Sequence, residues 1–139
     1  MLGYWKREKE TVDALRDGYM HTGDLATVDD QSFIYIVDRA KDMIISGGVN
    51  IYPQECENLL VTHPKVADAA VFGVPNSDLG EEVKAIVAFK PGKTATEKEI
   101  VDHCKEKLAA YKYPRVIEFL EALPKTATGK LQRKALRGK

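Results

Sequence analysis

Short apolar runs separated by polar turns set the pattern of this chain. The runs 25–28 and 33–37 flank the polar residues 29–32, which predicts a β-hairpin near the amino terminus. Three later stretches are rich in β-branched and apolar residues, and they predict strands over 66–74, 82–89 and 115–120.

Helical signals lie before, between and after these strands. They predict helices over 11–17, 53–62, 97–110 and 131–136. Pro53 suits the first position of the second helix, because a proline has no N–H to donate there, and His63-Pro64 ends that helix. Thr96 and Glu99 have the spacing of a capping box at the start of the third helix.

The order of these elements predicts the fold class. After the first hairpin it is strand, helix, strand, strand, helix, strand, which is typical of an α+β domain. We expect a small sheet of about three strands with helices on its faces, preceded by the β-hairpin. The 139 residues suffice for one ordinary domain with a hydrophobic core.

Composition narrows the classes of partner. The 21 Lys and Arg residues balance the 21 Asp and Glu residues, so no overall field favours nucleic acid or a membrane surface. No apolar run reaches the length of a transmembrane segment, and the first residues lack a signal-peptide core. Cys56 and Cys104 lack metal-ligand spacing and are expected to be reduced, partly buried thiols of a cytoplasmic protein. His21, His63 and His103 are scattered, so we predict no metal site.

The segment 38–53 combines a charged run, a short apolar run and a glycine pair, in the order DRAKDMIISGGVNIYP. We expect the charged run 38–42 to lie outside the core, and the run 43–45 to form a short buried strand. Gly47-Gly48 permits positive φ and leaves the backbone bare. A surface turn leading into a hairpin explains this pattern as well as a functional loop does.

The order of residues in segment 38–53 resembles the hinge and the following loop of the acyl-adenylate-forming ligases. That family includes acyl-CoA synthetases, luciferases and the adenylation domains of peptide synthetases, and the chain looks most like its acyl-CoA and aryl-CoA ligases. The resemblance implies that residues 1–37 are the carboxy-terminal tail of a large adenylation domain. Residues 38–139 would be a small mobile lid domain, with the hinge at 38–42. Lys41 matches the hinge position, where the backbone changes between two domain orientations.

A second motif, LPKTATGKLQR, lies in the locally basic carboxy-terminal stretch. It is not a Walker loop, because Pro124 and Leu131 stand where that loop needs Gly and Ser or Thr. A solvated basic tail and a local anion site both explain the basic composition. The motif resembles the family signature Leu-Pro-Lys-Thr-x-x-Gly-Lys followed by a basic helix, which implies that Lys130 is catalytic. Its ammonium group would contact the carboxylate and the α-phosphate, where adenylation develops negative charge.

The resemblance implies two nucleotide-binding residues. Asp24 follows a Thr-Gly turn and would bind the ribose hydroxyls of ATP, while Arg39 would contact the ribose or a phosphate. Alternatives remain for both: Asp24 as a turn-capping residue, and Arg39 as the partner of Asp38 or Asp42 in a salt bridge.

The same resemblance implies a CoA-binding set, in which small residues let a thiol arm pass and cations meet the nucleotide end. These residues are Ser46, Gly47, Gly48, Lys112 and Arg115. A plain hairpin turn is the alternative for the first three, and solvated side chains are the alternative for the last two.

The function implied is the carboxy-terminal domain of an ATP-dependent acyl-CoA ligase, which converts an acid and ATP with Mg to acyl-AMP and pyrophosphate and then forms the CoA thioester. The family's phosphate loop, adenine segment and acyl pocket are not among these residues, so we expect the chain to be inactive alone. Its partners would be the large amino-terminal domain and a carboxylic acid that the sequence does not identify. Two alternatives remain: an adenylation domain that loads a carrier protein, and a free-standing interaction domain whose Lys130 is read by a protein acetyltransferase.

Overall fold

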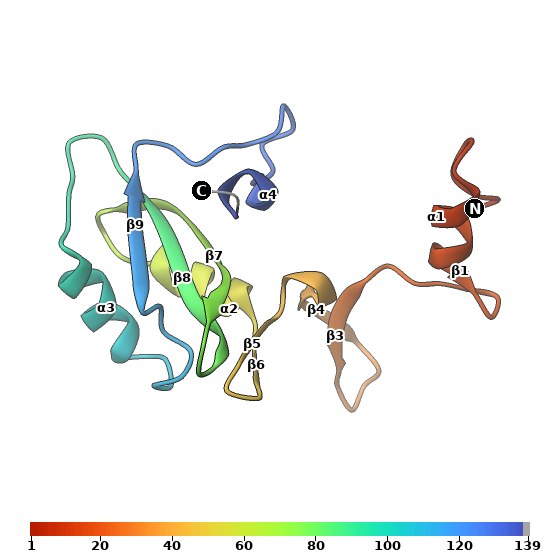
Figure 1. The fold of residues 1–139 in the computed structure, drawn as a ribbon, viewed down its shortest axis with the longest axis horizontal. Coiled ribbons are helices and arrows are strands. Elements are labelled where there is room, and N and C mark those ends of the chain that lie inside the picture. The colour runs from red at the N-terminus through yellow and green to blue at the C-terminus, as the bar shows by residue number, and fades with distance from the viewer. Residues whose placement is uncertain (138–139) are drawn as a thin grey trace. The chain divides into compact units, whose positions relative to one another are not determined.

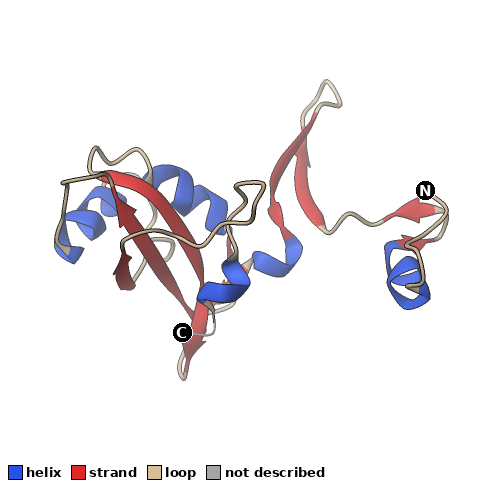
Figure 2. Ribbon diagram, turned by 90° about the horizontal axis from the view of Figure 1, so that it is seen from above, coloured by secondary structure: helices blue, strands red, loops and turns tan. Residues whose placement is uncertain are grey.

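The computed structural model describes residues 1–137. The chain divides into two compact units, Met1–Lys41 and a second that begins at Asp42. Figure 1 labels the elements of both units, and Figure 2 colours them by secondary structure. The domain boundary predicted after residue 37, with a hinge at 38–42, stays a prediction.

The first unit is a short helix followed by two hairpins. Helix α1 (Glu8–Ala14) leads into strands β1 (Leu15–Arg16) and β2 (Tyr19–Met20), and strand β3 (Asp24–Val28) then pairs in antiparallel fashion with β4 (Ile34–Arg39). The predicted hairpin is confirmed.

The first helix departs from its predicted range, 11–17. It begins earlier and ends at Ala14, because the following residues belong to the tight turn of the β1–β2 hairpin. Asp17 and Gly18 at this turn have φ of 53° and 79°, values that a helix cannot contain.

The second unit confirms the α+β class and adds strands to the predicted sheet. A single 3₁₀ turn, η1 (Ala40–Asp42), leads into it. Its strands are β5 (Ile44–Ser46), β6 (Val49–Ile51), β7 (Val66–Asn76), β8 (Gly80–Phe89) and β9 (Val116–Leu120). They form one five-stranded sheet in the order β6-β5-β8-β7, with β9 parallel to β8. The hairpin of β5 and β6 extends the predicted sheet of about three strands.

Three helices accompany this sheet: α2 (Pro53–Leu60), α3 (Glu97–Lys105) and α4 (Arg133–Leu136). The capping box predicted for α3 is present, because Thr96 accepts from the N–H of Glu99 and Glu99 accepts from the N–H of Thr96. Helix α3 ends five residues before the predicted position 110. The chain turns there and leads to Tyr113 and Pro114, which are both buried.

Side chains cover the sheet on both faces. On one face, Ala69 and Val71 of β7 pack in a cluster with residues of α2 and α3. On the other, Phe72 packs in a cluster with Leu123 and with Leu136 of α4. Strands that are buried on both sides carry near-continuous apolar runs, which explains why residues 66–74 alternate only loosely.

A histidine pair joins the end of α2 to α3. The rings of His63 and His103 meet edge to face with centroids 5.0 Å apart, and His63 is buried. His103 Nε2 lies 3.0 Å from Thr62 Oγ1 and 3.2 Å from the carbonyl oxygen of Leu59. The N–H of Lys65 donates to His63 Nδ1 at 3.3 Å, which requires that nitrogen to be unprotonated.

This arrangement makes stability depend on pH. Burial, then the nearby His103 and Lys65, lowers the pKa of His63 below its ordinary value near 6.5, although Glu99 opposes the shift. The unfolded chain therefore binds a proton more readily than the folded chain. The contribution of His63 to stability is complete above pH 6.5 and is lost as the pH falls below it.

We predict that the free energy of unfolding decreases from pH 7 to pH 5, and that His63→Gln makes this decrease smaller. Urea denaturation at several pH values measures it. The window avoids the contribution of Glu99, whose pKa is lowered to about 2 by the N–H of Thr96 and by Lys65 and whose protonation matters only below pH 4.5. His21→Gln, at an exposed position of the first unit, is the control. An unchanged slope in His63→Gln would refute the role of His63.

Candidate functional site

The β3–β4 hairpin brings the two predicted nucleotide-binding residues together. Asp24 and Arg39 are paired residues in the register of the two strands. The Arg39 guanidinium lies 3.2 Å from the Asp24 carboxylate and also donates to the carbonyl oxygen of Thr22 at 3.1 Å. Both side chains remain partly exposed, so the pair presents a carboxylate and a planar fork of donors to solvent.

A compact turn holds the predicted catalytic lysine. The N–H of Thr126 donates to the carbonyl oxygen of Lys130 at 2.8 Å, and the N–H of Lys130 donates back to the Thr126 hydroxyl at 3.1 Å. Gly129 has a φ of 81°, a left-handed conformation that glycine adopts without strain. Lys125 and Leu131 close the base of the turn as an isolated β-bridge. We call residues 124–132 the Lys130 loop.

The Lys130 side chain itself is exposed. No hydrogen bond or ion pair joins its ammonium group to any of residues 1–137. Its neighbour Lys125 differs, because its ammonium lies 2.6 Å from Asp68 Oδ2. The loop is therefore ordered by its backbone while the Lys130 ammonium stays available to a ligand or to another domain.

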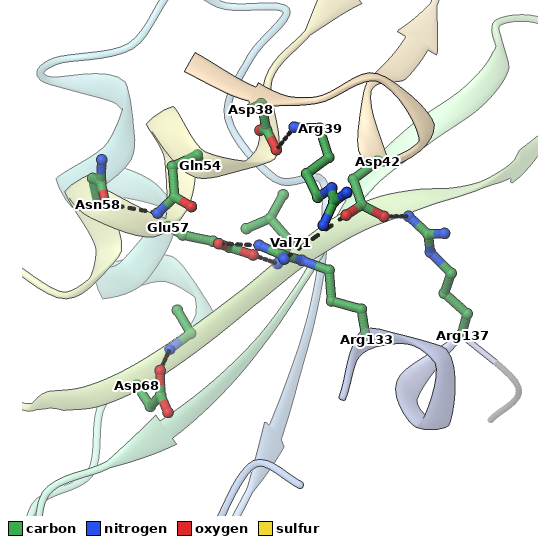
Figure 3. A network of polar contacts seen from close by, with 11 residues as sticks. Asp38, Arg39, Asp42, Gln54, Glu57, Asn58, Asp68, Val71, Arg133 and Arg137 are labelled. Atoms are coloured by element: carbon green, nitrogen blue, oxygen red, sulfur yellow. Dashed lines mark hydrogen bonds and ion pairs between the residues drawn. The ribbon is translucent and has the colours of Figure 1, made fainter. Parts of the chain in front are cut away.

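The basic helix after the loop is tied to two buried carboxylates (Figure 3). The Arg137 guanidinium lies 3.0 Å from Asp42 Oδ1. The Arg133 guanidinium lies 2.5 Å from Glu57 Oε2 and 3.9 Å from Asp42 Oδ2. The other oxygen of Glu57 accepts from the N–H of Val71 at 2.9 Å. Arg133 and Arg137 thus neutralise carboxylates of the protein itself, whereas Lys130 and Lys134 of the same basic stretch are exposed.

The same contacts correct the expectation for the charged run 38–42. Asp38 and Asp42 are buried, with exposures of 6% and 7%, whereas Arg39 and Lys41 are exposed. Asp42 is buried because Arg133 and Arg137 supply opposite charge. Asp38 accepts a hydrogen bond from the N–H of Arg39 at 2.7 Å.

The predicted CoA loop forms the turn of the β5–β6 hairpin. Gly47 and Gly48 have φ of 57° and 80°, which is the backbone that a two-residue hairpin turn requires. The N–H of Gly47 donates to the carbonyl oxygen of Leu79 at 2.9 Å, and Ser46 pairs with Gly80 of β8. The glycine pair is therefore explained by the turn, and its contact with CoA stays a prediction.

Lys112 and Arg115 both make local contacts. The Lys112 ammonium lies 2.8 Å and 2.9 Å from the two oxygens of Glu55, a contact that raises the pKa of Lys112. Arg115 donates to the Tyr113 hydroxyl and to the carbonyl oxygen of Ala110, and its guanidinium lies 4.2 Å from the centre of the Tyr113 ring. These contacts do not test whether Lys112 and Arg115 bind CoA, so that role stays a prediction.

The two cysteines are free thiols and are fully buried. Burial raises the pKa of Cys56 to about 12 and that of Cys104 to about 11, so neither forms a thiolate near neutral pH. Within residues 1–137, no group of three or more His, Cys, Asp or Glu is placed to hold a metal ion. None of the helices described is long and apolar enough to cross a membrane.

Sequence reasoning missed the carboxylates that anchor α4. Glu57 is one of several polar positions in the helix predicted over 53–62, so nothing in the sequence distinguishes it. Asp42 belongs to the charged run 38–42, which is expected to lie outside the core. A signal was present in the spacing of Arg133 and Arg137, which places two cations on one side of a short helix.

The family model of the AMP-binding enzyme C-terminal domain matches residues 55–130, which are more than half of the chain. The long-chain-fatty-acid–CoA ligase of Bacillus subtilis is 47% identical over 136 residues, which are 98% of this chain and 24% of that protein. The 2-succinylbenzoate–CoA ligase of Bacillus mycoides is 47% identical over 135 residues, or 97% of this chain and 28% of its own length.

Solved structures show the same similarity. ATP-bound MatB from Rhodopseudomonas palustris matches with a TM-score of 0.89 at 37% identity, over 98% of this chain and 27% of that one. The o-succinylbenzoate CoA synthetase of Bacillus subtilis, in complex with an acyl-adenylate intermediate, matches with a TM-score of 0.90 at 40% identity, over 97% and 28%.

These matches identify the class of the protein. The chain belongs to the family of AMP-binding enzyme C-terminal domains. It spans about a quarter of the length of the curated relatives that it matches.

Proposed function

We propose that this chain is the lid domain, with the adjoining tail of the large domain, of an ATP-dependent acid–CoA ligase. The relatives that match nearly the whole chain are named as CoA ligases. The observation that carries the proposal is the Lys130 loop, which has an ordered base and an exposed ammonium group without a partner in residues 1–137. A side chain held in this way can enter a site that another domain provides.

Asp24 and Arg39 fit the sugar and phosphate parts of a nucleotide. A carboxylate can accept from two neighbouring hydroxyls, and a guanidinium can donate to paired oxygens. Their ion pair places the guanidinium 3.2 Å from the carboxylate, so that one ligand can meet both groups. The ligand would be ATP, and we assign its magnesium and adenine contacts to the large domain.

Lys130 would act in the adenylation step. An oxygen of the substrate carboxylate attacks the α-phosphorus, the bond to pyrophosphate breaks, and acyl-AMP forms. Negative charge develops on the phosphate oxygens, and the Lys130 ammonium would stabilise it. An exposed lysine on a turn suits this task because its long stem reaches beyond the loop.

The second step requires a different surface of the lid. We propose that the domain turns about Lys41, so that Lys130 leaves the site and the β5–β6 turn at Ser46, Gly47 and Gly48 approaches it. The CoA sulfur then attacks the acyl carbon and AMP departs. Lys112 and Arg115 would lie toward the phosphates of CoA.

The acceptor needs a direct test, because one structural relative is named an amide bond synthetase rather than a CoA ligase. We propose CoA rather than a carrier protein, because the curated relatives compared above carry CoA in their names. A reducing cytoplasm suits the free thiols of Cys56 and Cys104. We further propose that a protein acetyltransferase could silence the enzyme by neutralising the exposed Lys130.

In the complete enzyme that carries this chain, we predict that Lys130→Ala slows adenylation by about a hundredfold to a thousandfold, since removal of one transition-state contact has this effect. Thioester formation from a supplied acyl-adenylate should be preserved. ATP–pyrophosphate exchange measures the first step, and release of AMP with CoA measures the second. Lys134→Ala removes an exposed charge from the adjacent helix and is the control. An equal loss in both steps would show that Lys130 is structural.

In the same enzyme, Lys41→Pro should slow the CoA step more than adenylation. Proline fixes φ near −65° and restricts the residue before it, so one domain orientation is trapped. Lys41→Ala removes the same side chain without fixing φ, and it should leave the ratio of the two rates unchanged. The hinge assignment fails if both rates fall equally in Lys41→Pro, or if Lys41→Ala reproduces the effect.

A further inference from the structure

Four charged side chains from three distant segments meet in one cluster of the second unit. Asp42 precedes β5, Glu57 lies in α2, and Arg133 and Arg137 belong to α4 and its carboxy-terminal end. Arg133 stands between the two carboxylates, with Glu57 on one side and Asp42 on the other (Figure 3). We call these four residues the anchor cluster.

Burial gives the anchor cluster a defined geometry. The side chains of Asp42 and Glu57 are each 8% exposed, and that of Arg133 is 22% exposed. Exposed ion pairs fluctuate and contribute little, whereas a buried carboxylate that loses its cation leaves an uncompensated charge. The Glu57 carboxylate is also fixed from the other side by the N–H of Val71 in β7. Arg133 therefore docks on a carboxylate that the sheet already holds in place.

The anchor cluster lies next to the Lys130 loop in the sequence. Only Leu131 and Gln132 separate Lys130 from Arg133. Gln132 is itself part of the loop base, because its N–H donates to the carbonyl oxygen of Pro124 at 2.9 Å and its side chain donates to the carbonyl oxygen of Lys125 at 3.1 Å. A change in the position of Arg133 must therefore move the base from which Lys130 extends.

We propose that Arg133 is a positioning residue for Lys130, and that the anchor cluster joins the Lys130 loop to the hinge. The inference rests on the proposed function for its catalytic part. Asp42 follows the hinge residue Lys41 directly, and its carboxylate holds both arginines of the cluster. A turn of the backbone at Lys41 is thereby transmitted to the Lys130 loop through one buried ion cluster.

The first test uses this 139-residue chain and needs no enzymatic activity. In Arg133→Met, hydrogen exchange should be about tenfold or more faster at the amides of the loop base, because a charge-assisted hydrogen bond is worth at least that factor in a local opening equilibrium. The amides to follow are those of Thr126, Gly129, Lys130 and Gln132. Glu57→Gln keeps an acceptor for Val71 and removes only the charge, so it should act in the same direction. Lys134→Met removes a charge from the exposed side of α4 and should leave these amides unchanged.

The second test uses the complete enzyme and separates positioning from folding. Arg133→Met should lower kcat for adenylation by up to about a hundredfold, the effect of a misplacement near 1 Å. KM for ATP and thioester formation from a supplied acyl-adenylate should change little. The double variant Arg133→Met/Lys130→Ala should be no slower in adenylation than Lys130→Ala alone, because Arg133 acts through Lys130.

Each outcome decides one part of the proposal. Unchanged exchange at the loop base in both Arg133→Met and Glu57→Gln would overturn the anchoring. Multiplicative losses in the double variant, or an equal loss in both half-reactions, would overturn the positioning role. If Arg133→Met does not fold, Arg137→Met takes its place, since that arginine is 40% exposed and contacts only the Asp42 end of the cluster. If the variants show faster loop exchange but the complete wild-type enzyme performs no adenylation, the anchoring stands and the proposed function is refuted instead.

Discussion

The placement of the carboxy-terminal segment depends on how the protein neutralises two interior carboxylates. Asp42 and Glu57 are almost inaccessible to solvent, and such groups are tolerated when they are paired and hydrogen-bonded. Arg133 and Arg137 provide that pairing from the end of the chain. Removal of one partner from a buried pair typically costs about 3–5 kcal/mol. That cost is large enough to keep α4, a helix of only four residues, in one position.

Glu57 links the architecture to the candidate site. One of its oxygens accepts from the N–H of Val71 on β7, the outer strand of the sheet, and the other meets Arg133. The contact satisfies a backbone N–H on the unpaired edge of β7 while it holds α4. Leu136 adds an apolar contact in the cluster that contains Phe72. The Lys130 loop thus has a rigid base and an exposed tip, a combination that suits a side chain acting on another domain.

Local physics made much of the fold predictable from sequence. Pro53, the Thr96–Glu99 box and the glycine pair mark their elements through backbone chemistry, and each marks an element in the structure. Features that depend on contacts between distant residues were harder to predict. Helix α3 ends early where the chain leads to the buried Tyr113, and the burial of Asp42 depends on arginines over 90 residues away. The Asp24–Arg39 pair depends on hairpin register, so its residues could be named from the family motif but not paired with each other. The catalytic and CoA assignments come from the family resemblance, because contacts within this chain do not indicate what an exposed lysine or a hairpin turn binds.

The central claim is that this chain supplies the lid of an acid–CoA ligase. The most direct test joins it to the large domain of the Bacillus subtilis long-chain-fatty-acid–CoA ligase, in place of the quarter of that relative that this chain matches. The test measures ATP–pyrophosphate exchange with a long-chain fatty acid. We expect exchange by the hybrid and none by this chain or the large domain alone. Exchange by the isolated chain would contradict the account. So would an inactive, folded hybrid when the same large domain is active with its own lid rejoined in the same way.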